Sequence, residues 1–135
     1  LVNEDEEEAY QRISEVFGVE PVKVMLVSEN MKFVNMKLDE MLQIAELFYE
    51  YDGENFIYLI SASHNKDSFG YEIADKVVNK YSLYGKEIEI KQYQVNEEGE
   101  RYSASFKEMG LKYFLFGTME QAEFELIVSN LHFLW

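Results

Sequence analysis

The pattern of apolar and polar positions along the chain predicts strands that alternate with helices. Apolar runs at residues 22–27, 56–60 and 111–117 have the length and the β-branched or aromatic content of buried strands. Residues 86–94 differ, because Ile88 and Ile90 alternate with charged neighbours, as in a strand with one solvent-exposed face. The apolar end of the chain, residues 131–135, predicts a fifth strand.

Helical spacing of apolar residues predicts the connections between these strands. Tyr10, Ile13 and Phe17 indicate an N-terminal helix behind an acidic first turn. Further helices are expected over residues 38–48, 69–81 and 103–110, and a last one opens at Thr118. The three middle helices would be terminated by Gly53, Gly85 and Gly110.

This alternation favours an α/β fold, with one layered domain and a mostly parallel five-stranded sheet that has helices on both faces. We expect residues 1–20 to form an acidic helix or arm and residues 21–135 to form the α/β domain. The third predicted strand, residues 86–94, has one face exposed to solvent and therefore belongs at an edge of the sheet. This favours the Rossmann-like strand order 3-2-1-4-5. The alternative is that residues 101–106 pair back on strand 86–94 as a hairpin, which would make the sheet mixed.

Charge and composition narrow the classes of partner. The 135 residues include 26 acidic and 12 basic ones, for a formal net charge of −14. Nucleic acid and membrane surfaces are therefore not expected as partners, because binding phosphates requires clustered Lys and Arg. A basic protein partner suits this charge. The chain has no cysteine, which excludes disulfides and thiolate metal sites; the compartment stays open, with the cytoplasm favoured. Its excess of Glu and Lys resembles that of thermophile proteins, although its eight Asn residues argue the other way.

A ligand site is predicted where the strand order reverses, at the carboxyl ends of the first, second and fourth strands. The residues at these ends are Ser28, Glu29, Asn30, Gly117 and Thr118, and the neighbouring loop contributes Ser63, His64, Asn65 and Lys66. The loop precedes a predicted helix, whose free N–H groups attract anions. An ordinary helix cap at Asp67 or Ser68 explains the same polar residues, and no glycine-rich phosphate motif is present.

No catalytic residue, metal ligand or cofactor is predicted. Ser61, Ser63, His64 and Asp67 include the residue types of a hydrolytic triad, but neighbours on one loop seldom converge as a triad requires. The two histidines are too few for an evident zinc site.

The C-terminal residues Phe133, Leu134 and Trp135 predict an interface with a second copy, because a terminal strand and large aromatic side chains favour pairing. The alternative is that Trp135 folds back over its own helices. The leading hypothesis is therefore a small acidic α/β module that acts through protein contacts as a homodimer. The alternative hypothesis is a small-ligand or nucleotide-sensing Rossmann-like domain.

Overall fold

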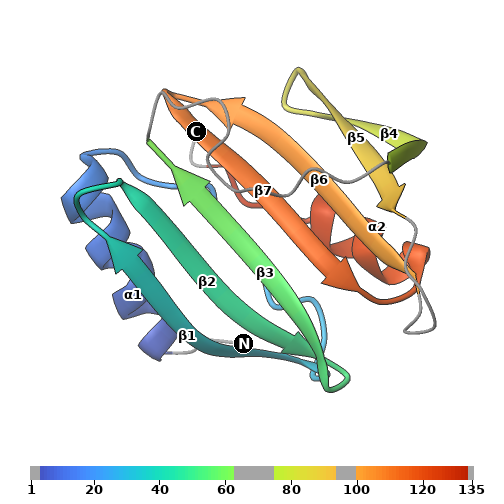
Figure 1. Ribbon diagram of the computed structural model, residues 1–135, viewed down its shortest axis with the longest axis horizontal. Helices are drawn as coiled ribbons and strands as arrows, with labels where there is room; N and C mark the ends of the chain where they lie inside the picture. Colours follow the sequence, from blue (N-terminus) through green and yellow to red (C-terminus); the bar gives the residue numbers. More distant parts are fainter. Residues whose placement is uncertain (1–3, 63–74, 94–99, 134–135) are drawn as a thin grey trace.

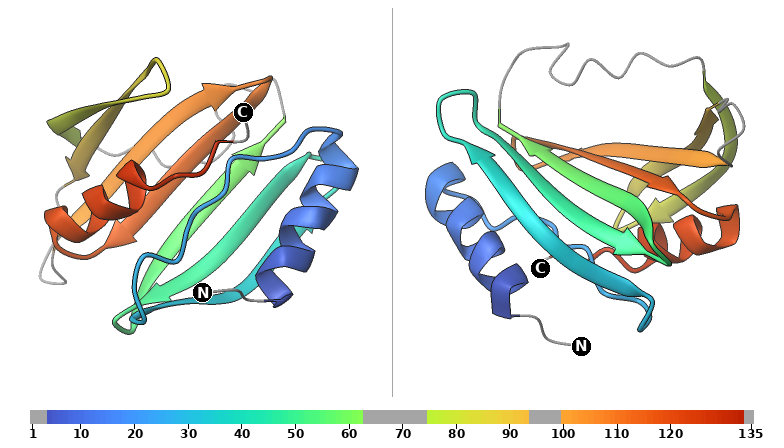
Figure 2. Two further views of the ribbon diagram at one scale, coloured as in Figure 1. Left: turned by 180° about the vertical axis from the view of Figure 1, so that it is seen from behind. Right: turned by 60° about the horizontal axis from the view of Figure 1, so that its bottom comes forward.

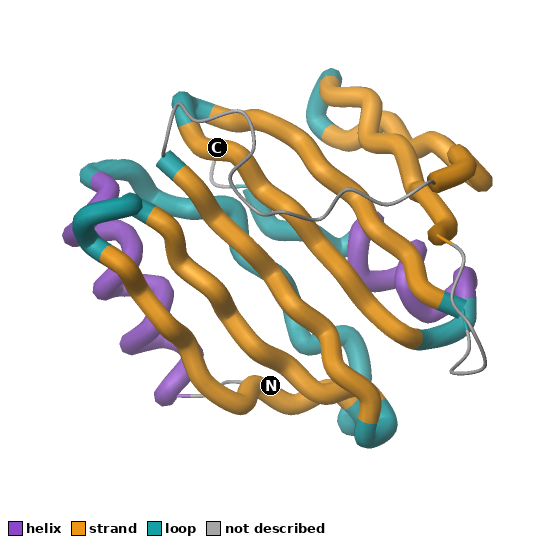
Figure 3. Tube along the Cα trace, viewed as in Figure 1, coloured by secondary structure: helices purple, strands orange, loops and turns teal. Residues whose placement is uncertain are grey.

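The computed structural model describes residues 4–62, 75–93 and 100–133, which form two helices and one seven-stranded sheet (Figures 1 and 3). The strand order is β1-β2-β3-β7-β6-β5-β4, and every neighbouring pair is antiparallel. In chain order the elements are α1 (Glu4–Phe17), β1 (Met31–Asp39), β2 (Ile44–Tyr51), β3 (Glu54–Ser61), β4 (Asp75–Leu83), β5 (Lys86–Tyr93), β6 (Arg101–Glu108), β7 (Leu111–Thr118) and α2 (Gln121–Ser129).

The predicted parallel α/β sheet with Rossmann-like order is wrong. Residues expected to be helical over 38–48 and 103–110 lie in β1, β2, β6 and the turns after β1 and β6, and the described part of 69–81 lies in β4. The strand predicted to be exposed on one face and to lie at an edge is β5, which lies next to the edge strand β4 and not at the edge itself. The mixed-sheet alternative is also wrong, although the hairpin pairing that it included is present, with Gln92 opposite Tyr102.

Three two-residue turns account for the difference. Asp52-Gly53, Tyr84-Gly85 and Met109-Gly110 have positive φ at both positions, between 47° and 82°. Such primed turns match the twist of antiparallel strands and are the preferred short hairpin connections. A glycine at positive φ also ends many helices, so the same residue type satisfies both interpretations. The burial in β2 distinguishes them, because Ala45, Leu47, Tyr49 and Tyr51 are buried at every second position.

One face of the sheet, here called the inner face, carries both helices and an extended segment between them (Figure 2). The predicted helices on both faces are therefore not observed among the described residues. The core lies between these layers and contains Tyr10 and Ile13 of α1 and Phe124 and Ile127 of α2. On the outer face of the central strands, Leu59 is 1% exposed and the half-buried rings of Phe114 and Phe116 stack, which explains why β3 and β7 are apolar at both parities.

The extended segment, residues 19–27, is named the strap. Its predicted strand at 22–27 does not join the sheet, because tyrosine hydroxyls bind its backbone instead. The Val22 N–H donates to the Tyr113 hydroxyl at 3.0 Å, and the Tyr58 hydroxyl donates to the Val22 carbonyl at 2.7 Å. The Val24 N–H donates to the Tyr10 hydroxyl at 3.0 Å. These bonds satisfy buried backbone groups that are not paired in a strand ladder.

The backbone of the C-terminal segment pairs with the strap rather than with a strand of the sheet. His132 forms an isolated antiparallel bridge with Lys23, with N–H to carbonyl distances of 2.8 and 3.0 Å. The fifth strand predicted over residues 131–135 is thus, in its described part, a single bridge. This short bridge nevertheless fixes His132 against the strap.

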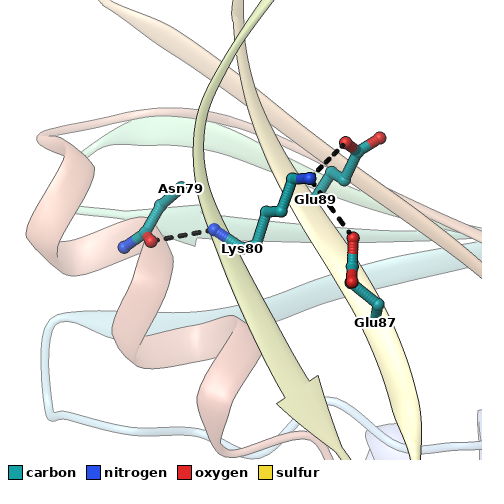
Figure 4. Close-up of polar contacts among 4 residues, drawn as sticks. All are labelled: Asn79, Lys80, Glu87 and Glu89. Carbon is teal, nitrogen blue, oxygen red and sulfur yellow. Dashed lines mark hydrogen bonds and ion pairs between the residues drawn. The ribbon is translucent and has the colours of Figure 1, made fainter.

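Both edge strands carry features that oppose pairing with another sheet. β1 has a bulge between Phe33 and Asn35, and β4 has one between Val77 and Asn79. On β4 the Lys80 Nζ lies 3.5 Å from Glu87 and 3.9 Å from Glu89 of β5, and its N–H donates to the Asn79 side chain (Figure 4). Bulges and charged side chains at sheet edges are common devices against aggregation.

Candidate functional site

Two of the three predicted ligand segments lie at the same end of the sheet. Ser28, Glu29 and Asn30 precede β1, and the Asn30 carbonyl accepts a hydrogen bond from the Asp52 N–H at 3.1 Å. Thr118, at the end of β7, lines a pocket together with Asp52, while Gly117 pairs with Phe56 near the start of β3. The antiparallel β2–β3 turn brings these segments together, which differs from the parallel strand ends that the sequence predicted.

The third segment, Ser63 to Lys66 with His64 and Asn65, lies outside the described residues. Ser61, just before it, pairs with Ile44 and Lys112 at the opposite end of β3 from Gly117. The predicted grouping of all three segments therefore stays a prediction.

The predicted interface residues are placed only in part. Phe133 is 3% exposed, and its ring packs 4.9 Å from Tyr84 and 5.5 Å from Phe106, between ring centroids. Leu134 and Trp135 lie outside the described residues. In the single chain Phe133 thus contributes to the core, and a role in an interface stays a prediction.

The pocket at this end has a volume of about 750 Å³ and is here called the acidic pocket. Its lining residues come from the β2–β3 turn, the segment that leads into β6 and the start of α2. Its described lining includes five carboxylates and no Lys or Arg. The lining residues are Tyr51, Asp52, Glu54, Glu100, Thr118, Met119, Glu120, Gln121, Ala122 and Glu123.

Local structure explains how these carboxylates converge. Asp52 sits at positive φ in the β2–β3 turn, a position that Asp tolerates, and Glu54 begins β3 beyond it. The Tyr102 hydroxyl donates to Glu100 at 2.6 Å, and the Met119 N–H donates to the Glu100 carbonyl at 3.3 Å. These two bonds hold the start of β6 against the junction of β7 and α2.

Gly117 permits the close packing beneath this junction. A Cβ at Gly117 would lie 2.8 Å from the Met119 side chain and 2.9 Å from the Phe56 ring. Glycine therefore lets Met119 fold over Phe56 as the chain turns into α2.

The electrostatics of the pocket favour a cationic ligand. Glu120 is the N-cap residue of α2 and Glu123 lies in its first turn, where negative charge suits the helix dipole. Burial, together with the hydrogen bond to Glu100, raises the pKa of Tyr102, so its hydroxyl remains a donor. No group of three or more acidic or histidine side chains among the described residues is arranged to hold a metal ion. The arrangement is suited to accept hydrogen bonds from Lys or Arg side chains, beside the apolar surface of Tyr51 and Met119.

Of the predicted ligand residues, Thr118 is among those that line the pocket, whereas the pocket carboxylates were not predicted. Asp52, Glu54, Glu100, Glu120 and Glu123 are spread over the chain and share no motif. The one local signal is the Asp52-Gly53 dipeptide, a strong hairpin indicator that would have placed two of them at a turn.

The described part of the chain contains no helix that is both long and apolar enough to span a membrane. Comparison with curated proteins and with solved structures found no match in either case. A family model described as Domain of unknown function (DUF4367) matches residues 21–131, a span that includes all seven strands and α2. Since this match covers more than half of the chain, the protein belongs to the DUF4367 family.

Proposed function

We propose that this domain is a non-enzymatic, homodimeric protein-binding module whose acidic pocket binds a basic segment of a partner protein. The observation that carries the proposal is a pocket of about 750 Å³ lined by five carboxylates without a cation among its described residues. The formal net charge of −14 adds long-range attraction for a basic partner.

The chemistry of the lining favours basic side chains over the other ligands considered. Phosphate groups of a nucleotide would meet Asp52, Glu54 and Glu120 at close range, and like charges in a shared pocket repel. An Arg guanidinium instead forms paired, charge-assisted hydrogen bonds with carboxylates. A volume of about 750 Å³ also lies within the range of specific ligand pockets, so it accommodates long side chains.

The test uses a fluorescein-labelled peptide of alternating Arg and Gly, titrated with the protein at low salt and followed by fluorescence anisotropy. The pocket variant combines Asp52→Asn, Glu54→Gln and Glu120→Gln, three exposed side chains. The control variant combines Glu4→Gln, Asp5→Asn and Glu8→Gln, which removes the same charge from exposed positions on α1.

We expect the pocket variant to weaken peptide binding at least tenfold and the control variant to weaken it only as far as the change in net charge requires. Equal weakening by both variants would show non-specific attraction and contradict the proposal. Tighter binding of spermidine than of the peptide would indicate a small cationic ligand and would also contradict it. Localisation in the cytoplasm is part of the proposal, supported by the absence of cysteine.

A further inference from the structure

The end of the sheet opposite the acidic pocket carries large apolar side chains at its turns. Met41 is 94% exposed and Leu42 57% exposed in the β1–β2 turn, Met109 is 64% exposed in the β6–β7 turn, and Tyr84 is 58% exposed in the β4–β5 turn. These four residues are named the turn rim. Exposed apolar patches mark interaction sites, and these four side chains share one end of the sheet.

Strand register places the three turns at one end. Leu38 pairs with Ala45 beside the β1–β2 turn, Ala45 pairs with Ile60, and Ile60 pairs with Tyr113 close to the β6–β7 turn. The Lys86 Nζ, next to the β4–β5 turn, lies 2.9 Å from Glu108 beside the β6–β7 turn. All three turns lie along the upper side of the sheet in Figure 1.

The residue types in two of these turns do not suit their backbone. Tyr84 has a φ of 50° and Met109 a φ of 47°, at the first position of a primed turn. Asn, Asp and Gly are preferred there, as with Asp52 in the β2–β3 turn, because other side chains strain the left-handed conformation. A local conflict of this kind, at an exposed position, is typical of a functional residue.

The β6–β7 turn also carries an uncompensated pair of positive charges. Lys107 and Lys112 lie directly opposite each other across the two strands. Like charges in this position destabilise a hairpin. Within the described part of the chain neither lysine forms an ion pair. The charge of this tip therefore suits an acidic counterpart.

An acidic hollow lies beside the β1–β2 turn of the same rim. Its volume is about 400 Å³, and it is lined by Lys37, Leu38, Asp39, Glu40, Met41 and Glu46. Three carboxylates outnumber its one lysine. Arg12 of α1 pairs with Glu40 at 3.2 Å and Lys37 lies opposite Glu46, so with Arg12 included the formal charge of the hollow is negative by one unit. Leu38 and Met41 provide an apolar wall.

We propose that the β6–β7 tip of one copy, with Met109 between Lys107 and Lys112, docks into the acidic hollow of a second copy in a two-fold symmetric dimer. Tip and hollow lie at the same end of the sheet, so one two-fold axis forms both contacts. The proposal rests on the homodimeric part of the proposed function and is independent of the acidic pocket.

The size of the rim predicts the strength of this dimer. The four rim side chains expose on the order of 500 Å² of largely apolar surface. Complete burial of these side chains in both copies would cover about 1,000 Å², so the contact lies at or below the lower limit of a specific interface. We therefore expect a reversible dimer that dissociates on dilution. The bulged, lysine-bearing edges of β1 and β4 disfavour the other common route to a sheet dimer.

The first test measures self-association of the full chain by sedimentation equilibrium from micromolar to millimolar concentration. Met109→Asn removes the docking side chain and places a favoured residue at positive φ, so the fold is retained and thermal stability is expected to be unchanged or higher. This variant is expected to weaken the dimer at least tenfold. Met25→Gln, at a 46% exposed position of the strap, is the matched control and is expected to leave it unchanged.

A charge exchange tests the pairing itself. Lys107→Glu and Glu46→Lys are each expected to weaken the dimer, and the double variant is expected to restore it, because the charges then attract again. The chain has no cysteine, so Met41→Cys and Met109→Cys chains can be mixed and oxidised. Mixed disulfides are expected to exceed those between two identical chains.

Three results would overturn the proposal. These are a monomer throughout the concentration range, a dimer that Met109→Asn leaves intact, and a charge exchange without restoration. The acidic pocket variant serves as a further control, since it is expected to dimerise normally. Failure of peptide binding and failure of dimerisation are therefore separate outcomes.

Discussion

The hydroxyl of Tyr58 provides a direct test of how the strap is held on the sheet. Tyr58 is 0% exposed, and its hydroxyl donates to the carbonyl of Val22, itself 2% exposed, at 2.7 Å. Tyr58→Phe removes this donor and leaves a buried carbonyl without it. The ring remains, so its stacking on Tyr113, with centroids 5.8 Å apart, is preserved.

The expected loss follows from the burial of the carbonyl. A buried polar group deprived of its partner costs about 1–3 kcal/mol of unfolding free energy. For a chain of 135 residues, each 1 kcal/mol lowers the melting temperature by roughly 3–4 °C, so a loss of roughly 3–12 °C is expected. No cavity larger than a hydroxyl is created, which keeps the cost below that of truncating the ring.

Urea unfolding followed by circular dichroism would measure this loss as a lower midpoint with an unchanged slope. Tyr84→Phe is the control, because it removes the same hydroxyl from a side chain that is 58% exposed. If Tyr58→Phe and Tyr84→Phe differ by less than about 0.5 kcal/mol, within the usual effect of a surface change, the hydroxyl does not hold the strap. Tyr113→Phe, which removes the acceptor of the Val22 N–H, tests the second bond to the strap in the same way.

Two further predictions concern the core and the acidic helix. Gly117→Ala should lower the unfolding free energy by about 1–3 kcal/mol, because the added Cβ would lie 2.8 Å from Met119 and 2.9 Å from Phe56. An unchanged midpoint of urea unfolding would contradict the packing described for the β7–α2 junction. Burial raises the pKa of Glu6, so the folded state holds this proton more tightly than the unfolded state and the unfolding free energy falls as pH rises through the raised pKa. Glu6→Gln keeps an acceptor for the Tyr49 hydroxyl, which lies 2.5 Å from the Glu6 carboxylate in the wild type. This variant should make the unfolding free energy, measured by urea titration at several pH values, fall less steeply with pH. An unchanged dependence on pH would contradict the assignment to Glu6.

The amino-acid sequence by itself determined where several elements lie. The spacing of Tyr10 and Ile13 correctly predicted α1, and a helix was correctly expected after Thr118. The apolar runs of β3 and β7 and the alternation of Ile88 and Ile90 in β5 correctly predicted strands. These signals suffice because they are local, since each depends only on the period with which neighbouring side chains are buried.

Local signals were ambiguous where one residue type serves two structures. Gly85 and Gly110 have positive φ, as in a helix C-terminus, but each follows another residue at positive φ and so completes a hairpin turn. Asp52-Gly53 and the alternation from Ala45 to Tyr51 did carry the information for a hairpin, although a competing helical spacing obscured it.

Only the tertiary structure decided how the strap is held and which charges meet. Val22 and Val24 have the composition of a strand, yet tyrosine hydroxyls from α1, β3 and β7 bind their backbone, and these partners are distant in sequence. The carboxylates of Asp52, Glu100 and Glu120 converge only because antiparallel pairing returns the chain repeatedly to one end of the sheet. The period with which side chains are buried depends only on residues that are neighbours in sequence. Which distant polar groups meet depends instead on the order and register of all the strands in the sheet.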